Sequence, residues 1–137
     1  MRPIRTSYSR IDALELWQSV TMAMVRSEGP DISARQMAIL TAVYLDDQPH
    51  TVRSLAETLN VTKAVITRAL DTLSRYKMVK RCADPRDKRS ITVGRTALGT
   101  RYLAGFADNI CTHMPKSKVT YETSRERRVV VPVSIAR

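Results

Sequence analysis

Apolar residues recur at three- and four-residue steps along much of the chain, a spacing that places them on one face of an α-helix. The first such segment, Arg10–Ser27, is ended by Gly29-Pro30, and its apolar face is wider than one core requires. Part of that face is therefore expected to bury against another chain. The next helix is predicted from about Ala34 to Tyr44, since Ser33 stands three residues before a glutamine, as in a capping box.

Two shorter helices joined by a tight turn follow. The first is predicted over Val52–Leu59, and the second begins after the capping residue Thr62 and runs to about Tyr76. Asn60 marks the turn between them and Val61 turns inward. This arrangement is a helix-turn-helix, with the apolar stripe of its second helix buried: Ile66, Ala69, Leu70 and Leu73.

The residues outside that stripe suit the major groove of DNA. Arginine can bond guanine in a bidentate manner, hydroxyl groups can reach phosphates or base edges, and alanine leaves room for a thymine methyl. Composition alone equally fits a polar face that only meets water. The candidates are Thr62, Lys63, Ala64, Thr67, Arg68, Asp71 and Arg75.

A hairpin with a basic tip is predicted next. Met78–Ala83 and Ser90–Val93 are short extended segments, and the turn Asp84–Ser90 between them carries four charges after its proline. A helix-turn-helix followed by such a hairpin forms a winged helix. The wing can reach a neighbouring minor groove, where the negative potential favours an inserted arginine.

Charge supports a phosphate-rich partner, because the excess is concentrated. The chain has 23 basic and 13 acidic residues, a net charge of +10. Met1–Thr62 holds six basic and seven acidic residues, whereas Lys63–Arg101 holds eleven and three. This pattern is typical of nucleic-acid binding, although a merely solvated basic surface would share it.

From Ile32 to about Tyr102 the sequence resembles the MarR family of winged-helix transcriptional regulators. The resemblance lies in the helix start, LAETLNVTKAVITRALDTL and DPRDKRS, in that order and spacing. It implies a mainly α fold with a small β-hairpin wing, a recognition helix in the major groove and a wing arginine in the minor groove. The wing residues so implied are Arg89 for the minor groove, Asp87 holding its guanidinium, and Arg86 and Lys88 on phosphates.

The chain departs from the family pattern at both ends of the wing. Lys77 stands where the family commonly has glycine, so we expect the turn to be made without a positive φ. Arg95-Thr96 stands in place of the usual Leu-Thr, whereas Gly99 matches the expected glycine. How the wing is anchored to the body stays open.

The C-terminal part departs further. Ala97–His113 is predicted to be an amphipathic helix ended by Pro115, where the family continues into another long helix of the dimer interface. The basic, valine-rich segment 114–137 is not helical in pattern. It could be an edge strand, a docking peptide or a disordered tail, and Pro132 limits any strand there to an edge.

The sequence therefore predicts four segments. Residues 1–31 form an N-terminal helix for packing or dimerisation, 32–95 the winged helix-turn-helix, 96–113 a further helix, and 114–137 the tail.

Other chemistry has little support in the sequence. Paired carboxylates, phosphate loops and nucleophilic triads do not occur, so we predict neither catalysis nor a cofactor. Cys111 and His113 would lie on nearly opposite sides of a helix, which disfavours a metal site. Cys82, beside Arg81, is a weak candidate for redox sensing.

The location expected from the sequence is the cytoplasm. Two cysteines are too few for a disulfide framework, and no apolar signal region follows the basic start. The longest uncharged stretches, Leu16–Val25 and Gln36–Leu45, are half the length needed to span a bilayer.

The function predicted is that of a sequence-specific regulator of transcription that binds double-stranded DNA as a homodimer. Occlusion of polymerase would make it a repressor, and activation is equally compatible with the residues. The alternative is a protein interaction module that acts through its first helix or its tail, with weak DNA binding.

Overall fold

The computed structural model describes residues 3–4, 8–87, 89–116, 118–121 and 129–132, with backbone alone for 3–4, 118–121 and 129–132. Its contacts divide the chain into two compact units. The larger is Glu28–Ala107, and the smaller combines Met1–Ser27 with Asp108–Arg137. No helix in the described part is long and apolar enough to cross a membrane.

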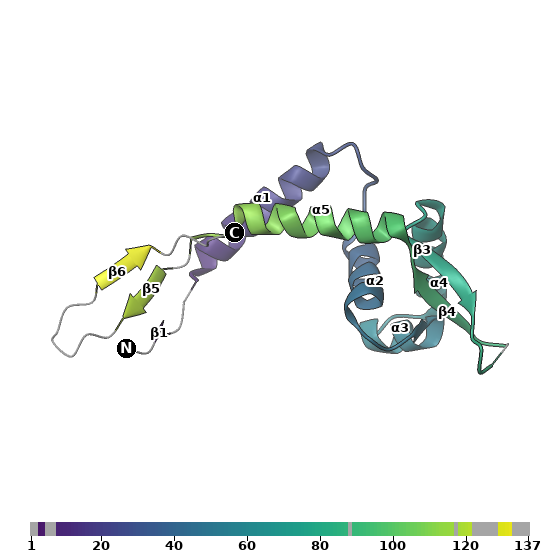
Figure 1. Cartoon of the computed structure of the whole chain (residues 1–137). Coiled ribbons are helices and arrows are strands. Elements are labelled where there is room, and N and C mark those ends of the chain that lie inside the picture. The colour runs from purple at the N-terminus through teal and green to yellow at the C-terminus, as the bar shows by residue number, and fades with distance from the viewer. Residues whose placement is uncertain (1–2, 5–7, 88, 117, 122–128, 133–137) are drawn as a thin grey trace. The chain divides into compact units, whose positions relative to one another are not determined.

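The larger unit is a winged helix-turn-helix (Figure 1). Its small sheet is antiparallel in the order β2-β4-β3, and β3 and β4 form a hairpin that extends beyond the helices (Figure 1). Its elements are α2 (Ala34–Leu45), β2 (His50–Thr51), α3 (Val52–Leu59), α4 (Lys63–Arg75), β3 (Val79–Ala83), β4 (Ile91–Arg95) and the first part of α5 (Ala97–His113). The helices and the hairpin agree with the sequence prediction, whereas β2 was not predicted.

The helices of this unit begin where their capping residues stand. The Ser33 hydroxyl accepts a hydrogen bond from the Gln36 amide, and the Gln36 side chain accepts one from the Ser33 amide in return. Thr51 caps α3 with a reciprocal pair of the same kind to Ser54, and the Thr62 side-chain oxygen caps α4 by accepting a hydrogen bond from the Val65 amide. These contacts satisfy amide groups that the first helical turn leaves without partners.

The turn after α4 corrects one expectation. Lys77 adopts a φ of 58°, so the prediction that this turn avoids a positive φ is wrong. The Lys77 amide donates to the Ser74 carbonyl (2.9 Å), and the Met78 amide donates to the Leu73 carbonyl (3.0 Å). Met78 and Leu73 are both buried, which completes a Schellman motif. The bonds and the apolar contact together impose the left-handed conformation on a lysine.

Lys77→Gly is therefore expected to stabilise the protein by about 0.5 to 1 kcal/mol. The substitution removes the steric cost of a left-handed side chain, and the greater freedom of glycine in the unfolded chain offsets part of that gain. Urea unfolding measures the change. Asn60→Gly is the matched control. Asn60 also has a positive φ (51°), but asparagine tolerates this conformation better than lysine does, so this substitution should stabilise the protein less. Equal stabilities for the wild type and Lys77→Gly would contradict the prediction.

The core of the larger unit is aliphatic, as the low aromatic content of 5% requires. Tyr102 packs partly buried against it from α5. Burial raises the pKa of Tyr102, and the nearby Asp31 carboxylate raises it further. The buried residues are Ile32, Ile39, Leu40, Val43, Leu55, Ala56, Ile66, Ala69, Leu70, Leu73, Met78, Val79 and Val93.

The smaller unit contains α1 (Arg10–Arg26), the end of α5 and a second sheet. The strands are β1 (Pro3–Ile4), β5 (Lys118–Tyr121) and β6 (Val129–Pro132), antiparallel in the order β1-β5-β6. The described residues of the C-terminal segment, 114–116, 118–121 and 129–132, contain no helix, in agreement with the prediction. Of the three interpretations of that segment, the edge strand is the one observed for β6.

Most of the apolar face of α1 is open to solvent in the single chain. Val20 is buried, and its carbonyl accepts a hydrogen bond from the Asn109 side chain (3.3 Å). By contrast, Ile11, Leu14 and Trp17 are 67%, 68% and 64% exposed. Three large apolar side chains so exposed on one helix are characteristic of an interaction surface.

Candidate nucleic-acid interface

Helix α4 has one buried and one exposed face. The four residues predicted to face inward are all buried in the core. The opposite stripe consists of Ala64, Arg68, Asp71 and Arg75, which helical spacing places along one line. The six residues predicted on this helix as DNA contacts are exposed, as is the seventh, its N-cap Thr62. Their exposure leaves the whole polar surface of α4 accessible to a partner.

Arg68 lies beside a second arginine. A shallow hollow between α4 and the start of α2 is lined by Arg68, Thr72, Ser33 and Arg35, among others. Sequence reasoning did not single out Arg35, because nothing in the chain pattern indicates that the start of α2 lies against this side of α4. The exposed Arg35 extends the basic surface beyond the recognition helix.

The opposite flank of α4 is joined to the wing by an ion pair. Arg81 Nη2 of β3 lies 2.6 Å from Asp71 Oδ1 of α4. Sequence reasoning did not assign Arg81 a role, since a helix-to-strand contact has no fixed spacing in sequence. The contact shows that the exposed stripe of α4 and the first strand of the wing adjoin each other.

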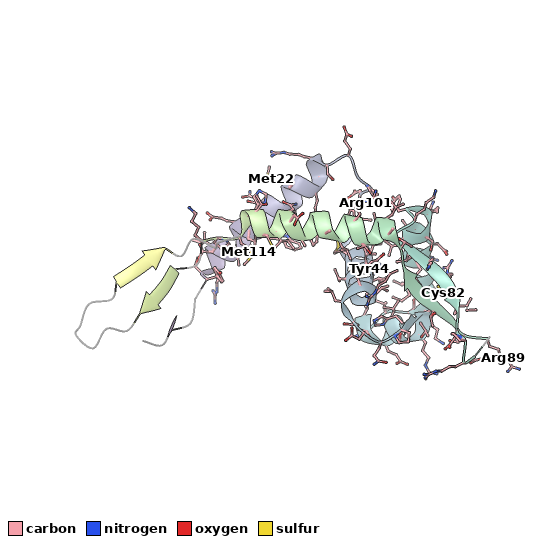
Figure 2. The ribbon with its side chains drawn as sticks, viewed as in Figure 1. Met22, Tyr44, Cys82, Arg89, Arg101 and Met114 are labelled. Atoms are coloured by element: carbon pink, nitrogen blue, oxygen red, sulfur yellow. The ribbon has the colours of Figure 1, made fainter. Side chains whose placement is uncertain are left out.

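The wing tip is built by two aspartate turns. Asp84 Oδ1 accepts a hydrogen bond from the Arg86 amide (2.9 Å), and Asp87 Oδ1 accepts one from the Arg89 amide (3.0 Å). Asp87 thus shapes the turn through the backbone, and the expected hydrogen bond from the Arg89 guanidinium to Asp87 stays a prediction. Figure 2 shows Arg89 at the tip, directed away from the helices.

The structure describes three of the four predicted wing residues. Arg86, Asp87 and Arg89 are exposed, whereas Lys88 lies outside the described residues. The exposed arginines are free to approach a nucleic acid.

Arg95 anchors the second wing strand to the body. Its Nε donates to the Val43 carbonyl and its Nη2 to the Asp46 carbonyl, both at 2.9 Å. These carbonyls belong to the C-terminal end of α2, where a cation is favourable. The guanidinium also lies 5.9 Å from the centre of the Tyr44 ring. Arg95 thus anchors the wing, a role that the sequence left open.

Tyr44 of α2, labelled in Figure 2, forms hydrogen bonds to residues at both ends of the wing. Its hydroxyl donates to the Met78 carbonyl (2.7 Å) and accepts from the Thr96 amide (2.8 Å). The Thr96 hydroxyl in turn donates to the Lys77 carbonyl (2.7 Å). Gly99 leaves the space for this cluster, because a Cβ there would collide with the Tyr44 hydroxyl and the Met78 carbonyl.

The described residues add no evidence for redox sensing by a cysteine or for a metal site. Cys82 is half-buried on β3 and Cys111 is exposed on α5, and both are free thiols. Redox sensing by Cys82 stays a prediction. Within the described ranges, no three His, Cys, Asp or Glu side chains are grouped so that they could hold a metal ion.

The fold and the exposed helix with its basic wing define a winged helix-turn-helix protein of the DNA-binding type. Residues 32–91 match the sequence profile of the MarR family. This segment, which makes up less than half of the chain, is similar to the MarR family. No curated protein sequence matches the chain.

Solved structures agree on the fold. The DNA complex of S. aureus MepR is 24% identical, with 75% of this chain and 82% of that chain covered and a TM-score of 0.64. MepR bound to ethidium bromide is 25% identical, covering 75% and 72%, with a TM-score of 0.63. The transcriptional regulator Tm0710 from Thermotoga maritima is 20% identical, with a TM-score of 0.59. That match covers 74% of this chain and 66% of Tm0710, slightly under two thirds of its length.

Proposed function

We propose that the protein is a transcriptional regulator that binds specific sequences of double-stranded DNA. The observation that carries the proposal is the contact between Asp71 on α4 and Arg81 on β3, because it makes the exposed helix face and the basic wing neighbours on one surface. A helix and a wing side by side fit adjacent grooves of a duplex. The MarR-family match and the likeness to MepR, which has been solved with DNA, support the same function.

Each part of the surface has its own role in this proposal. Thr67 and Arg68 read base edges in the major groove, and Arg89 enters the minor groove. The remaining basic residues bind phosphates and set the register of the protein on the duplex. These phosphate-binding residues are Lys63, Arg75, Arg86 and Lys88.

Salt dependence tests this division of roles. A surface with about six phosphate contacts is expected to lose about a thousandfold in affinity between 50 and 200 mM salt, through release of counterions. The preference for one selected sequence over an unrelated duplex should persist at both concentrations, because base contacts carry it. Fluorescence anisotropy with labelled duplexes measures both quantities. Loss of all sequence preference at either salt concentration would contradict the proposal.

The protein acts as a homodimer in this proposal, with α1 in the interface. Ile11, Leu14 and Trp17 are exposed in the single chain and would be buried by a second copy. A dimer predicts a near-palindromic binding site with half-sites about one helical turn, or about 10 bp, apart. Light scattering gives the oligomeric state, and binding-site selection gives the symmetry. A monomer that selects an asymmetric site would rule out this assembly.

The same apolar side chains favour a second candidate function. A winged helix that binds another protein through α1 would also expose them in the isolated chain. Such a module would show little sequence preference for DNA at any salt concentration, which separates it from a regulator.

A further inference from the structure

Asp71 is an unexpected residue for a surface that meets a polyanion. It lies on the exposed stripe of α4 between Arg68 and Arg75, one turn from each. An unpaired carboxylate there would be repelled by the phosphates on either side of the groove. A positively charged neighbour would reduce this repulsion. A hydrogen-bond donor on the DNA would make use of the Asp71 carboxylate as an acceptor.

Arg81 is the partner that the structure provides. Side chains alternate between the two faces of a strand, so Arg81 shares the face of β3 on which Val79 is buried beside α4. This geometry directs the arginine at the helix, where its Nη2 reaches Asp71 Oδ1 at 2.6 Å. The carboxylate is thereby neutralised and oriented from the wing side.

Fold stability does not account for this pair. The Arg81 and Asp71 side chains are 38% and 53% exposed, and ion pairs so accessible to water contribute little to folding. Half of the Asp71 side chain stays accessible, and a carboxylate can accept several hydrogen bonds at once. The Asp71 carboxylate can therefore accept further hydrogen bonds on the surface proposed to face the groove.

We propose that Asp71 reads a cytosine in the major groove and that Arg81 is its positioning residue. The cytosine N4 amino group is the donor a carboxylate pairs with in the major groove. Adenine also presents a donor, N6, but beside the acceptor N7, which repels a carboxylate. The inference rests on the function proposed above and names one base that this surface recognises.

Binding-site selection tests the base assignment. The full chain is used to select duplexes from a random library, as wild type and as Asp71→Asn. The wild type is expected to select a cytosine at one position of each half-site, and Asp71→Asn to replace it by adenine, which asparagine bonds through N6 and N7. The preference should reverse by about tenfold or more, measured with the two selected duplexes.

The possible failures of this experiment are distinguishable. If the wild type selects no motif, the proposed function fails and this inference fails with it. If the wild type selects a motif that Asp71→Asn leaves unchanged, the proposed function stands and the cytosine assignment is overturned.

The positioning role of Arg81 needs a control for the loss of one positive charge. Arg53→Ala supplies it, because Arg53 is also an exposed arginine in an ion pair, with Glu57 on α3 (3.0 Å). Arg81→Ala is expected to lower affinity for the cytosine site about tenfold more than Arg53→Ala does, and to weaken the preference for cytosine. Arg81→Lys should restore part of both, and the melting temperatures of all three variants should match the wild type within a few degrees.

Combining substitutions separates positioning from simple phosphate binding. In an Asp71→Ala background, Arg81→Ala should cost no more affinity than Arg53→Ala, because the group that it positions is already absent. An Arg81→Ala loss that is the same in both backgrounds would mean that Arg81 acts independently of Asp71, which would overturn the positioning role.

Discussion

Gly99→Ala is expected to destabilise the protein by about 2 kcal/mol or more. The added methyl group would collide with the Tyr44 hydroxyl and the Met78 carbonyl, which are already bonded to each other. Forcing extra volume into such a site costs about 1 to 3 kcal/mol, and displacing Tyr44 also breaks its hydrogen bond to Thr96. The helix-forming tendency of alanine offsets at most about 1 kcal/mol. Thermal and urea unfolding measure the net loss.

The same helix offers a matched control. A Cβ at Gly105 would meet nothing within 4 Å, so Gly105→Ala should stabilise the protein by up to about 1 kcal/mol. Tyr44→Phe removes the hydroxyl with which the new methyl collides, so it should cost less in the Gly99→Ala background than in the wild type. Gly99→Ala and Gly105→Ala variants of equal stability would show that the cluster around Tyr44 does not require a glycine.

Arg68→Ala is expected to lower affinity for the selected duplex by about 1 to 3 kcal/mol and to relax the preference at one base pair. Arg68 stands on the exposed stripe of α4, and arginine pairs most often with guanine O6 and N7. Because the substitution removes a base contact, binding to unrelated duplexes should fall much less. Anisotropy titrations against the selected duplex and its single-base variants give both numbers.

Arg86→Ala is the control for the charge that Arg68→Ala removes. Arg86 is exposed at the wing and is assigned to a phosphate, so its loss should weaken all duplexes nearly equally. The slope of log affinity against log salt concentration should also become shallower by about one, because one fewer counterion is released. If both substitutions weakened all sequences alike, Arg68 would be a phosphate contact and not a base contact.

Local signals in the sequence were sufficient to predict the helices of the winged domain. Ser33 with Gln36, and Thr62, each cap the helix that they were expected to begin. The first helix carries a similar signal, since Ser9 and Asp12 form a capping box that the sequence analysis overlooked. Such signals work because capping depends on residues a single turn apart.

Features set by tertiary contacts could not be predicted in this way. A lysine gives no indication of a positive φ. The conformation of Lys77 follows from the hydrogen bonds of the Lys77 and Met78 amides to the end of α4 and from the burial of Met78 in the core. The two-residue strand β2 is too short to show a periodicity. Arg81 meets Asp71 only because a helix and a strand are packed together, which no spacing rule predicts.

The same distinction between local signals and tertiary contacts applies to the candidate site. The exposed face of α4 follows from the helical period, so the six residues predicted on it and its N-cap Thr62 are accessible. The anchoring role of Arg95 depends on which backbone groups lie within its reach, so the sequence left it open, and the hydrogen bond from the Arg89 amide to Asp87 was not predicted for the same reason.

Methylation interference on the selected duplex tests the central claim, that α4 and the wing occupy adjacent grooves, most directly. Methyl groups at guanine N7 report on the major groove, and those at adenine N3 on the minor groove. The account predicts interference at guanine N7 in the middle of each half-site and at adenine N3 in its flank, with the flank signal lost in Arg89→Ala. Interference confined to a single groove, or a flank signal that Arg89→Ala leaves intact, would contradict it.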